Sequence, residues 1–230
     1  MDKNARIPAA KTAIVLIEPQ NDFLSPGGTM YAYIKDQLAA RGVIQNLQNL
    51  LESARGKVKI FFVPFHPFEK GFPELKKGGP GCEGLRGIEM DMKADWGTGA
   101  WLKGTPGPEI IKELTPQPGD IVVEGKMTLD AFHSTPLDYL LRANQIEYVA
   151  FTGFHTNWCV ESSARSAYDK GYRVIVVADC TATDTDEEQK YAEKWIFPKI
   201  GRVMSSSEFL AALSEEQPVV APLKKEAANV

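Results

Sequence analysis

The feature that most constrains this chain is a six-residue run near its N-terminus, Thr12–Ile17, in which every residue after the threonine is apolar. A half-buried strand alternates apolar and polar residues, whereas an unbroken apolar run is typical of a central parallel strand covered on both faces. Four further apolar-rich runs, predicted as strands, follow at residues 58–63, 121–123, 149–152 and 173–178. The sequence therefore predicts a sheet whose strands are buried on both sides.

The segments between these runs carry apolar residues at helical spacing. Helices are predicted over residues 34–54, 109–114, 136–141 and 186–195, and over a segment between Thr156 and Gly171. A last helix is predicted over residues 208–213, with Ser207 as its cap. A short edge strand is predicted at Val203–Met204. Strands and helices alternate without internal repeats, which favours one doubly wound α/β domain with three α/β/α layers. We expect this domain to span residues 1–215 and a polar C-terminal tail to span residues 216–230.

Composition excludes several classes of protein. The chain has 26 Lys and Arg against 30 Asp and Glu, and the resulting charge of −4 argues against nucleic acid as the main partner. No apolar run reaches the roughly 20 residues of a membrane span. The three cysteines, Cys82, Cys159 and Cys180, form neither a disulfide framework nor a zinc pattern, so we expect a reducing cytoplasm. No metal or other cofactor is expected, and a small molecule is the expected partner.

Three unlike reactive side chains follow predicted strands: Glu18, Lys126 and Cys159. Carboxyl ends of parallel strands share one sheet edge, where α/β proteins bind ligands. Cys159 also falls where a strand passes into a helix capped by Thr156 or Asn157, and a helix N-terminus favours a thiolate and can hold an oxyanion. The non-catalytic alternatives are a surface loop carboxylate for Glu18, a solvated side chain for Lys126 and a small buried thiol for Cys159.

The chain resembles the isochorismatase-like cysteine hydrolases, whose amidohydrolase branch includes N-carbamoylsarcosine, ureidoacrylate and biuret hydrolases and nicotinamidases. Three blocks carry the resemblance: Ile17–Phe23 (IEPQNDF), Gly119–Phe132 with GDIVV and Lys126, and Gly153–Gly171 with TNWCV. Their order spans roughly residues 10–210. The resemblance implies a six-stranded, mainly parallel sheet and a catalytic triad of Glu18, Lys126 and Cys159. It also implies an oxyanion hole from the backbone N–H groups of Trp158 and Cys159, and a cis peptide bond about two residues before Cys159.

Two departures from the family pattern affect the site. The family usually has aspartate where this chain has Glu18, and one more methylene adds about 1.5 Å of reach. We expect Pro19 to re-aim the backbone, and Asp22 to be structural. The Asp-x-His metal motif of nicotinamidases is replaced by Pro64-Phe65-His66-Pro67, so that metal site is not expected.

The sequence leaves the reaction open between related alternatives. A cysteine nucleophile favours hydrolysis of a C–N bond in a small amide or in a carbamoyl or ureido compound. The alternatives are an isochorismatase-type vinyl-ether hydrolase, a catalytically inactive binding member, and a partner-binding protein that uses the tail from Pro218. The expected pocket-wall residues are Phe23, Tyr31, Phe65, Trp101, His155 and Trp158. The resemblance implies a homodimer or homotetramer.

Overall fold

The apolar runs form one six-stranded parallel sheet in the computed structural model, which describes residues 6–70, 73 and 101–214. Its strand order is β4-β3-β2-β5-β6-β7, and every neighbouring pair is parallel. The strands are β2 (Thr12–Ile17), β3 (Lys59–Val63), β4 (Ile121–Val122), β5 (Tyr148–Phe154), β6 (Arg173–Ala182) and β7 (Gly201–Met204). A separate two-residue pair joins β1 (Ile7–Pro8) and β8 (Leu213–Ser214).

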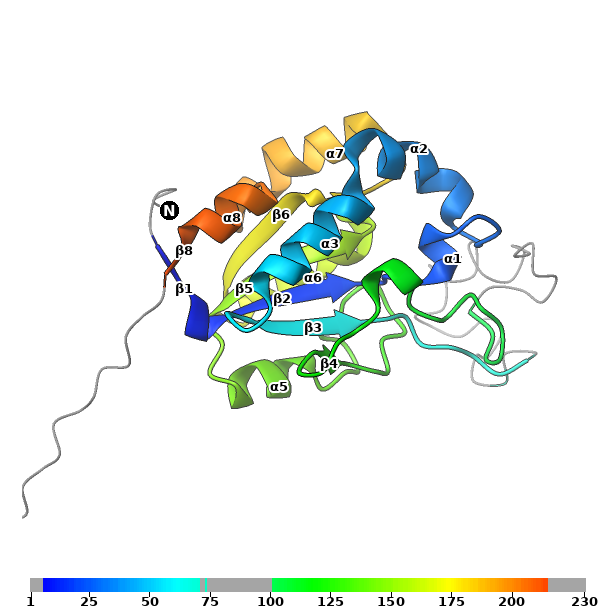
Figure 1. Ribbon diagram of the computed structural model, residues 1–230, viewed down its shortest axis with the longest axis horizontal. Helices are drawn as coiled ribbons and strands as arrows, with labels where there is room; N and C mark the ends of the chain where they lie inside the picture. The colour runs from blue at the N-terminus through cyan, green and yellow to red at the C-terminus, as the bar shows by residue number, and fades with distance from the viewer. Residues whose placement is uncertain (1–5, 71–72, 74–100, 215–230) are drawn as a thin grey trace, which may run out of the picture.

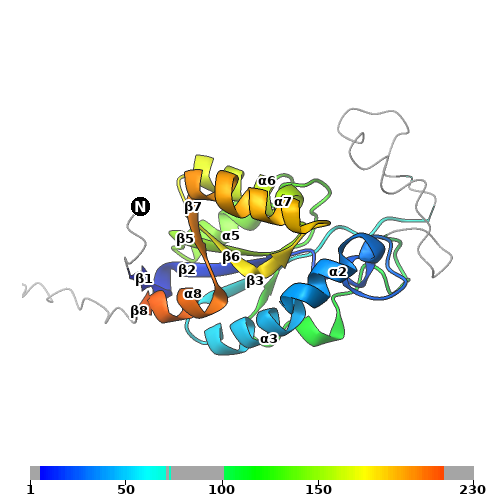
Figure 2. The same cartoon turned by 90° about the horizontal axis from the view of Figure 1, so that it is seen from above.

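Helices cover both faces of this sheet, so the expected three-layer α/β/α fold is confirmed (Figures 1 and 2). One face carries α2 (Tyr31–Arg41), α3 (Val43–Ala54) and α8 (Ser206–Ala212), and the other carries α5 (Leu137–Ala143), α6 (Glu161–Asp169) and α7 (Asp186–Tyr191). The shorter helical segments are α1 (Asn21–Leu24), the 3-10 turns Ala9–Lys11, Lys112–Leu114 and Phe197–Lys199, and the π-helical turns Thr156–Val160 and Ala192–Ile196.

Each strand contributes side chains to two hydrophobic cores, because successive side chains point to opposite faces of the sheet. In β2, Ile14 and Leu16 pack into the cluster beneath α2 and α3, whereas Ala13 and Val15 pack into the cluster beneath α5 and α6. All six residues of β2 are buried. This two-sided burial is the reason that the strand reads as a continuous apolar run.

Several predicted helix boundaries are wrong for local reasons. The single helix expected over residues 34–54 is two helices, because Gly42 takes a left-handed conformation (φ +61°) between α2 and α3. The helix expected at 109–114 is only a 3-10 turn at Lys112–Leu114. The last helix begins two residues earlier than expected, because Ser205, and not Ser207, caps it in a capping box with Glu208.

Two neighbouring strands, β5 and β6, also run further than predicted. β5 continues through Gly153 to Phe154, and β6 continues to Ala182. A Cβ atom on Gly153 would lie 2.1 Å from the carbonyl oxygen of Ile17, and Gly153 has φ +106°. Glycine at this position therefore does not end the strand, as the sequence suggested, but allows β2 and β5 to approach closely at their carboxyl ends.

The strand order reverses between β2 and β5. From β2 the chain adds β3 and β4 on one side, and then β5, β6 and β7 on the other. Such a reversal opens a crevice outside the carboxyl ends of the strands, which is where α/β sheets bind ligands. In Figure 1 the arrowheads of β2 and β3 point to the side of the molecule where α1 lies.

Some sequence-based predictions fall on residues that the structure does not describe. The tail at 216–230 and Cys82 lie outside the described residues, and the domain boundary at residue 215 stays a prediction. Within the described ranges, no helix has the length and apolar character needed to cross a bilayer.

Candidate active site

Glu18, Lys126 and Cys159, separated by up to 141 positions in the sequence, meet at the carboxyl edge of the sheet. Glu18 follows β2, Lys126 lies four residues after β4, and Cys159 lies in the turn after β5. All three side chains are buried. The structure thus brings together the three reactive groups that the sequence placed separately at strand ends.

Glu18 leaves the sheet with an unusual backbone conformation. Its φ of +54° lies in the left-handed region, which non-glycine residues seldom adopt, while its N–H still donates to the Val63 carbonyl at 3.1 Å. The change of direction therefore occurs at Glu18 itself and is not left to Pro19. This turn brings the longer glutamate side chain against Lys126, whose Nζ donates to Glu18 Oε1.

Lys126 is held in place from several sides. Its backbone forms a parallel bridge with Phe65, and its carbonyl accepts from the His66 N–H at 2.7 Å. Its Nζ donates to the Thr128 carbonyl at 2.6 Å and lies 5.0 Å from the centre of the Phe65 ring. The side chain is 0% exposed, so the alternative of a solvated loop lysine is excluded.

Cys159 lies in the π-helical turn Thr156–Val160, which leads directly into α6. Its Sγ is 3.6 Å from Lys126 Nζ, and the same Nζ donates to Glu18, so the three side chains form one cluster. The predicted cap at Thr156 or Asn157 is wrong: His155 precedes the turn, and both side chains bond elsewhere, to Gln189 and Thr183 respectively. The cis peptide bond joins Phe154 and His155, earlier in the chain than the resemblance implied.

Burial is the largest single influence on the pKa values of Cys159 and Lys126. Burial, followed by the Glu18 carboxylate, raises the pKa of the Cys159 thiol, and the opposing effect of Lys126 does not reverse that direction. Burial alone disfavours the Lys126 ammonium, but the negative charges that Cys159 and Glu18 can carry raise its pKa. These directions favour a neutral thiol beside a charged lysine, and the thiolate expected from the helix N-terminus stays a prediction.

The raised pKa of Cys159 gives a direct prediction. Thiolate absorbance in the ultraviolet, taken as the difference between the wild type and Cys159→Ala, should show no step between about pH 6 and about pH 9, where a free cysteine titrates. Subtraction of the variant removes the signals of Cys82, Cys180 and the tyrosines. A step centred near neutral pH would contradict the electrostatic description and restore a preformed thiolate.

Five of the six expected pocket-wall residues form a continuous series of ring contacts. Trp101 contacts Phe65 and Phe23, with centroids 5.2 and 5.5 Å apart, and His155 contacts Phe23 and Trp158 at 5.8 and 5.9 Å. The series begins beneath Lys126 and ends next to Cys159. Tyr31 is partly buried against the same core cluster, but it takes no part in the ring contacts found among the described residues.

The two proposed oxyanion donors differ in their surroundings. The Trp158 N–H donates to the His155 carbonyl at 3.1 Å, as does the Val160 N–H. The Trp158 N–H is thus engaged in this structure, and its role as an oxyanion donor stays a prediction. The Cys159 N–H is the donor nearest to the reacting sulfur, and we retain it in the mechanism below.

Two residues of the IEPQNDF block hold the site together: Asp22, for which a structural role was expected, and Gln20, which sequence reasoning missed. Asp22 binds the Trp101 N–H at 2.9 Å and the Thr29 hydroxyl at 3.0 Å, which fixes the segment that carries Trp101. Burial raises the pKa of Asp22, although the hydrogen bonds from Trp101 and Thr29 oppose this. Gln20 bonds both the N–H and the carbonyl of Phe65. The IEPQNDF block was the only signal for these roles, and it does not specify their partners.

Asp184 was also missed, and it pairs with His155 at 2.9 Å from Nδ1 to Oδ1. The pair connects the loop after β6 to the residue that precedes the π-helical turn. Nothing in the local sequence around Asp184 indicates this partner, which lies 29 residues earlier. In the part of the chain that the structure describes, no group of three or more His, Cys, Asp or Glu side chains is arranged to hold a metal ion.

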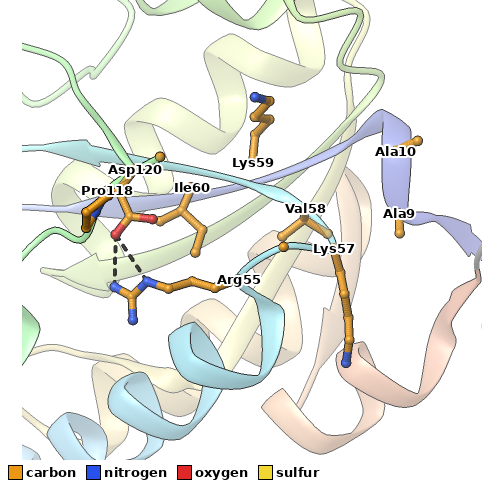
Figure 3. Close-up of a pocket in the computed structure, with 11 residues that line it drawn as sticks. Ala9, Ala10, Arg55, Lys57, Val58, Lys59, Ile60, Pro118 and Asp120 are labelled. Carbon is orange, nitrogen blue, oxygen red and sulfur yellow. Dashed lines mark hydrogen bonds and ion pairs between the residues drawn. The ribbon is translucent and has the colours of Figure 1, made fainter.

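A separate hollow of about 360 Å³ lies at the opposite edge of the sheet, beside the start of β3 (Figure 3). Its most prominent polar contact is the ion pair of Arg55 with Asp120, at 2.9 Å. Figure 3 shows Lys57 and Lys59 extending away from one another, so these two cations do not converge on a ligand. The reactive groups of this chain thus lie at the carboxyl edge and not in this hollow.

Comparison with known proteins agrees with this arrangement. A family model described as the isochorismatase domain matches residues 12–208. A cysteine hydrolase from Pseudomonas syringae pv. phaseolicola has a similar fold, with a TM-score of 0.75 and 24% identity over 90% of this chain and 94% of that one. An N-carbamoylsarcosine amidase from Thermoplasma acidophilum is 27% identical over 85% of this chain and 96% of that one, with a TM-score of 0.64. An isochorismatase family protein from Burkholderia thailandensis is 26% identical over 90% and 98%, with a TM-score of 0.64.

Proposed function

Because this chain belongs to the isochorismatase family of hydrolases, we propose that it cleaves a C–N bond of a small amide or of a carbamoyl or ureido compound through a thioester on Cys159. One observation carries the proposal: Lys126 Nζ contacts both the Cys159 Sγ and the Glu18 carboxylate, so the thiol, the base and the cation form one buried cluster. A thiol beside a base and a fixed cation is the arrangement that nucleophilic catalysis requires.

The first half of the reaction forms the thioester. Glu18 takes the proton of the Cys159 thiol as the sulfur attacks the carbonyl carbon of the substrate. Lys126 stabilises the negative charge that forms on sulfur, and the Cys159 N–H donates to the oxyanion of the tetrahedral intermediate. Protonated Glu18 then donates to the leaving nitrogen, the C–N bond breaks, and ammonia or an amine departs.

The second half regenerates the enzyme. Glu18, again a carboxylate, accepts a proton from water as the water oxygen attacks the thioester carbonyl. The C–S bond breaks, the sulfur regains a proton from Glu18, and the acid product leaves. The net reaction consumes one water and yields one acid and one ammonia or amine, and no redox partner is needed.

The substrate class follows from the same cluster and from one relative. The Thermoplasma acidophilum protein is named as an amidase of N-carbamoylsarcosine, and the cysteine and its two charged partners suit attack on an amide or ureide carbonyl. The aromatic series from Phe65 to Trp158 suits a small flat substrate. Vinyl-ether hydrolysis would leave the buried thiol without a role.

Ammonia release from a substrate panel tests the proposal. The purified protein is incubated with N-carbamoylglycine, N-carbamoylsarcosine, biuret and nicotinamide, and ammonia is measured enzymatically. We expect release from at least one carbamoyl compound, and rapid quenching followed by peptide mass spectrometry should find the acyl group on Cys159. Tight binding of these compounds without ammonia release would instead indicate an inactive binding member.

A further inference from the structure

The mechanism leaves two buried polar atoms unused beside the site. His155 and Trp101 are each 2% exposed, and His155 Nε2 and Trp101 Nε1 have no hydrogen-bond partner in the structure as described for residues 6–70, 73 and 101–214. Buried polar atoms are nearly always paired, because an unpaired one loses its bonds to water and gains nothing in exchange. Two such atoms, on rings that pack against the same neighbour, are positions at which a ligand could supply the missing partners.

The hydrogen bond to Asp184 determines whether Nε2 of His155 acts as a donor or as an acceptor. A carboxylate only accepts hydrogen bonds, so the Asp184 oxygen 2.9 Å from Nδ1 fixes the proton of the neutral ring on that nitrogen. Nε2 is then an acceptor. The Trp101 indole nitrogen is always a donor. The site thus contains one buried acceptor and one buried donor, both without partners among the described residues.

Both rings lie in the aromatic series that borders the reactive cluster. They pack against the same ring, that of Phe23, at 5.8 Å for His155 and 5.5 Å for Trp101. His155 also contacts Trp158, the residue before Cys159, and Trp101 contacts Phe65, over which Lys126 lies. The acceptor on His155 and the donor on Trp101 therefore belong to two rings that both contact Phe23. The His155 ring is linked through Trp158 to Cys159, and the Trp101 ring is linked through Phe65 to Lys126.

We propose that His155 is a specificity-determining residue that accepts an N–H from the substrate through Nε2, and that the site thereby selects ureides with a free N–H on the nitrogen retained in the product. Asp184 acts as a positioning residue by fixing the tautomer. A ureide has N–H donors on both sides of its carbonyl, whereas a simple amide has them on one side only. Glu18 serves the leaving nitrogen, so His155 is available for the other, and Trp101 donates to a substrate oxygen.

This inference rests on the proposed C–N hydrolysis, and one matched pair of substrates tests it separately. N-carbamoylglycine has an N–H on the retained nitrogen, and N-carbamoylsarcosine has a methyl group there. We expect the wild type to favour N-carbamoylglycine by at least about tenfold in kcat/KM, the effect of one lost hydrogen bond. His155→Phe should bring the ratio close to one, mainly through KM, and His155→Gln, which keeps an acceptor, should retain part of the preference.

A matched control and a spectroscopic measurement complete the design. His133→Phe makes the same change at an exposed position and should leave the ratio unchanged. The chain has only three histidines, so ¹⁵N-histidine spectra of Cys159→Ala can be assigned with these variants. The His155 signal should show an unprotonated Nε2 that shifts when N-carbamoylglycine is added.

Each outcome bears on one of the two proposals. Ammonia release with an equal preference for the two compounds, or an unchanged ratio in His155→Phe, would overturn the role of His155 and leave the proposed hydrolysis intact. A neutral His155 with its proton on Nε2 would overturn it as well. No ammonia from any compound would overturn the proposed hydrolysis, while a shift of the Nε2 signal by N-carbamoylglycine would still support recognition by His155.

Discussion

Replacing Cys159 with alanine is expected to lower turnover by about 10⁴-fold or more, because no other group in the site can form the thioester. The remaining activity would come from binding and from the oxyanion donor alone. Turnover is measured as ammonia release from the best carbamoyl compound of the panel, and folding is checked by thermal unfolding. Cys159→Ser should also lose most activity, since a hydroxyl is a weaker nucleophile beside the same base.

Cys180 provides the matched control for this change. It is also a free, buried cysteine, it lies in the core cluster beneath α2 and α3, and burial raises the pKa of its thiol as well. Cys180→Ala removes the same atoms from an interior position outside the cluster of Glu18 and Lys126. We expect it to keep normal turnover with a modest loss of stability. Similar activity losses in both variants would show that the effect of Cys159→Ala is structural and would remove the nucleophile from the mechanism.

Replacing Lys126 with methionine is expected to remove most turnover and to lower the free energy of unfolding by about 3–5 kcal/mol. Lys126 and Glu18 are 0% and 1% exposed, so loss of the ammonium leaves the Glu18 carboxylate buried without its counter-charge. Truncation of one member of a buried ion pair is costly for this reason, whereas removal of both charges is often neutral. The free energy is measured by urea unfolding, followed by circular dichroism.

The double variant Glu18→Gln/Lys126→Met separates stability from catalysis. It should recover most of the lost stability, because no uncompensated charge remains, and it should stay inactive, because both the base and the cation are gone. Lys190→Met is the surface control. Lys190 forms an ion pair with Asp186, and the two side chains are 71% and 56% exposed, so the loss in free energy of unfolding should stay below about 1 kcal/mol. Recovery of activity in the double variant, or an equal cost at both lysines, would contradict the role given to this buried pair.

The sequence predicted the strands of the central sheet and the edge on which the site lies. Both follow from local patterns: an apolar run such as Thr12–Ile17 reports burial on both faces, and the residue that follows it lies at a strand end. Glu18, Lys126 and Cys159 could therefore be assigned to one edge without knowledge of their contacts. The family match over residues 12–208 and the parallel strand order agree with that assignment.

Sequence patterns predicted the wrong structure at positions where two backbone conformations have similar intrinsic free energies. Apolar spacing continues across Gly42, and only packing decides that α2 and α3 are separate helices with a left-handed residue between them. Gly153 resembled a strand breaker, but the carbonyl of Ile17, more than a hundred residues earlier, makes glycine necessary inside β5. Such constraints come from a neighbouring strand and have no local signature.

The sequence by itself thus determined the fold class and the strand-end positions of the three reactive residues, whereas the pocket-wall residues stay predictions. Only the tertiary structure decided how Glu18 turns towards Lys126, that burial raises the pKa of the Cys159 thiol, and that Asp184 pairs with His155. The physical reason is the range of the interactions. Periodicity and turn chemistry act over a few neighbouring residues, whereas burial, charge pairing and hydrogen bonding in the site join segments that only the folded sheet brings together.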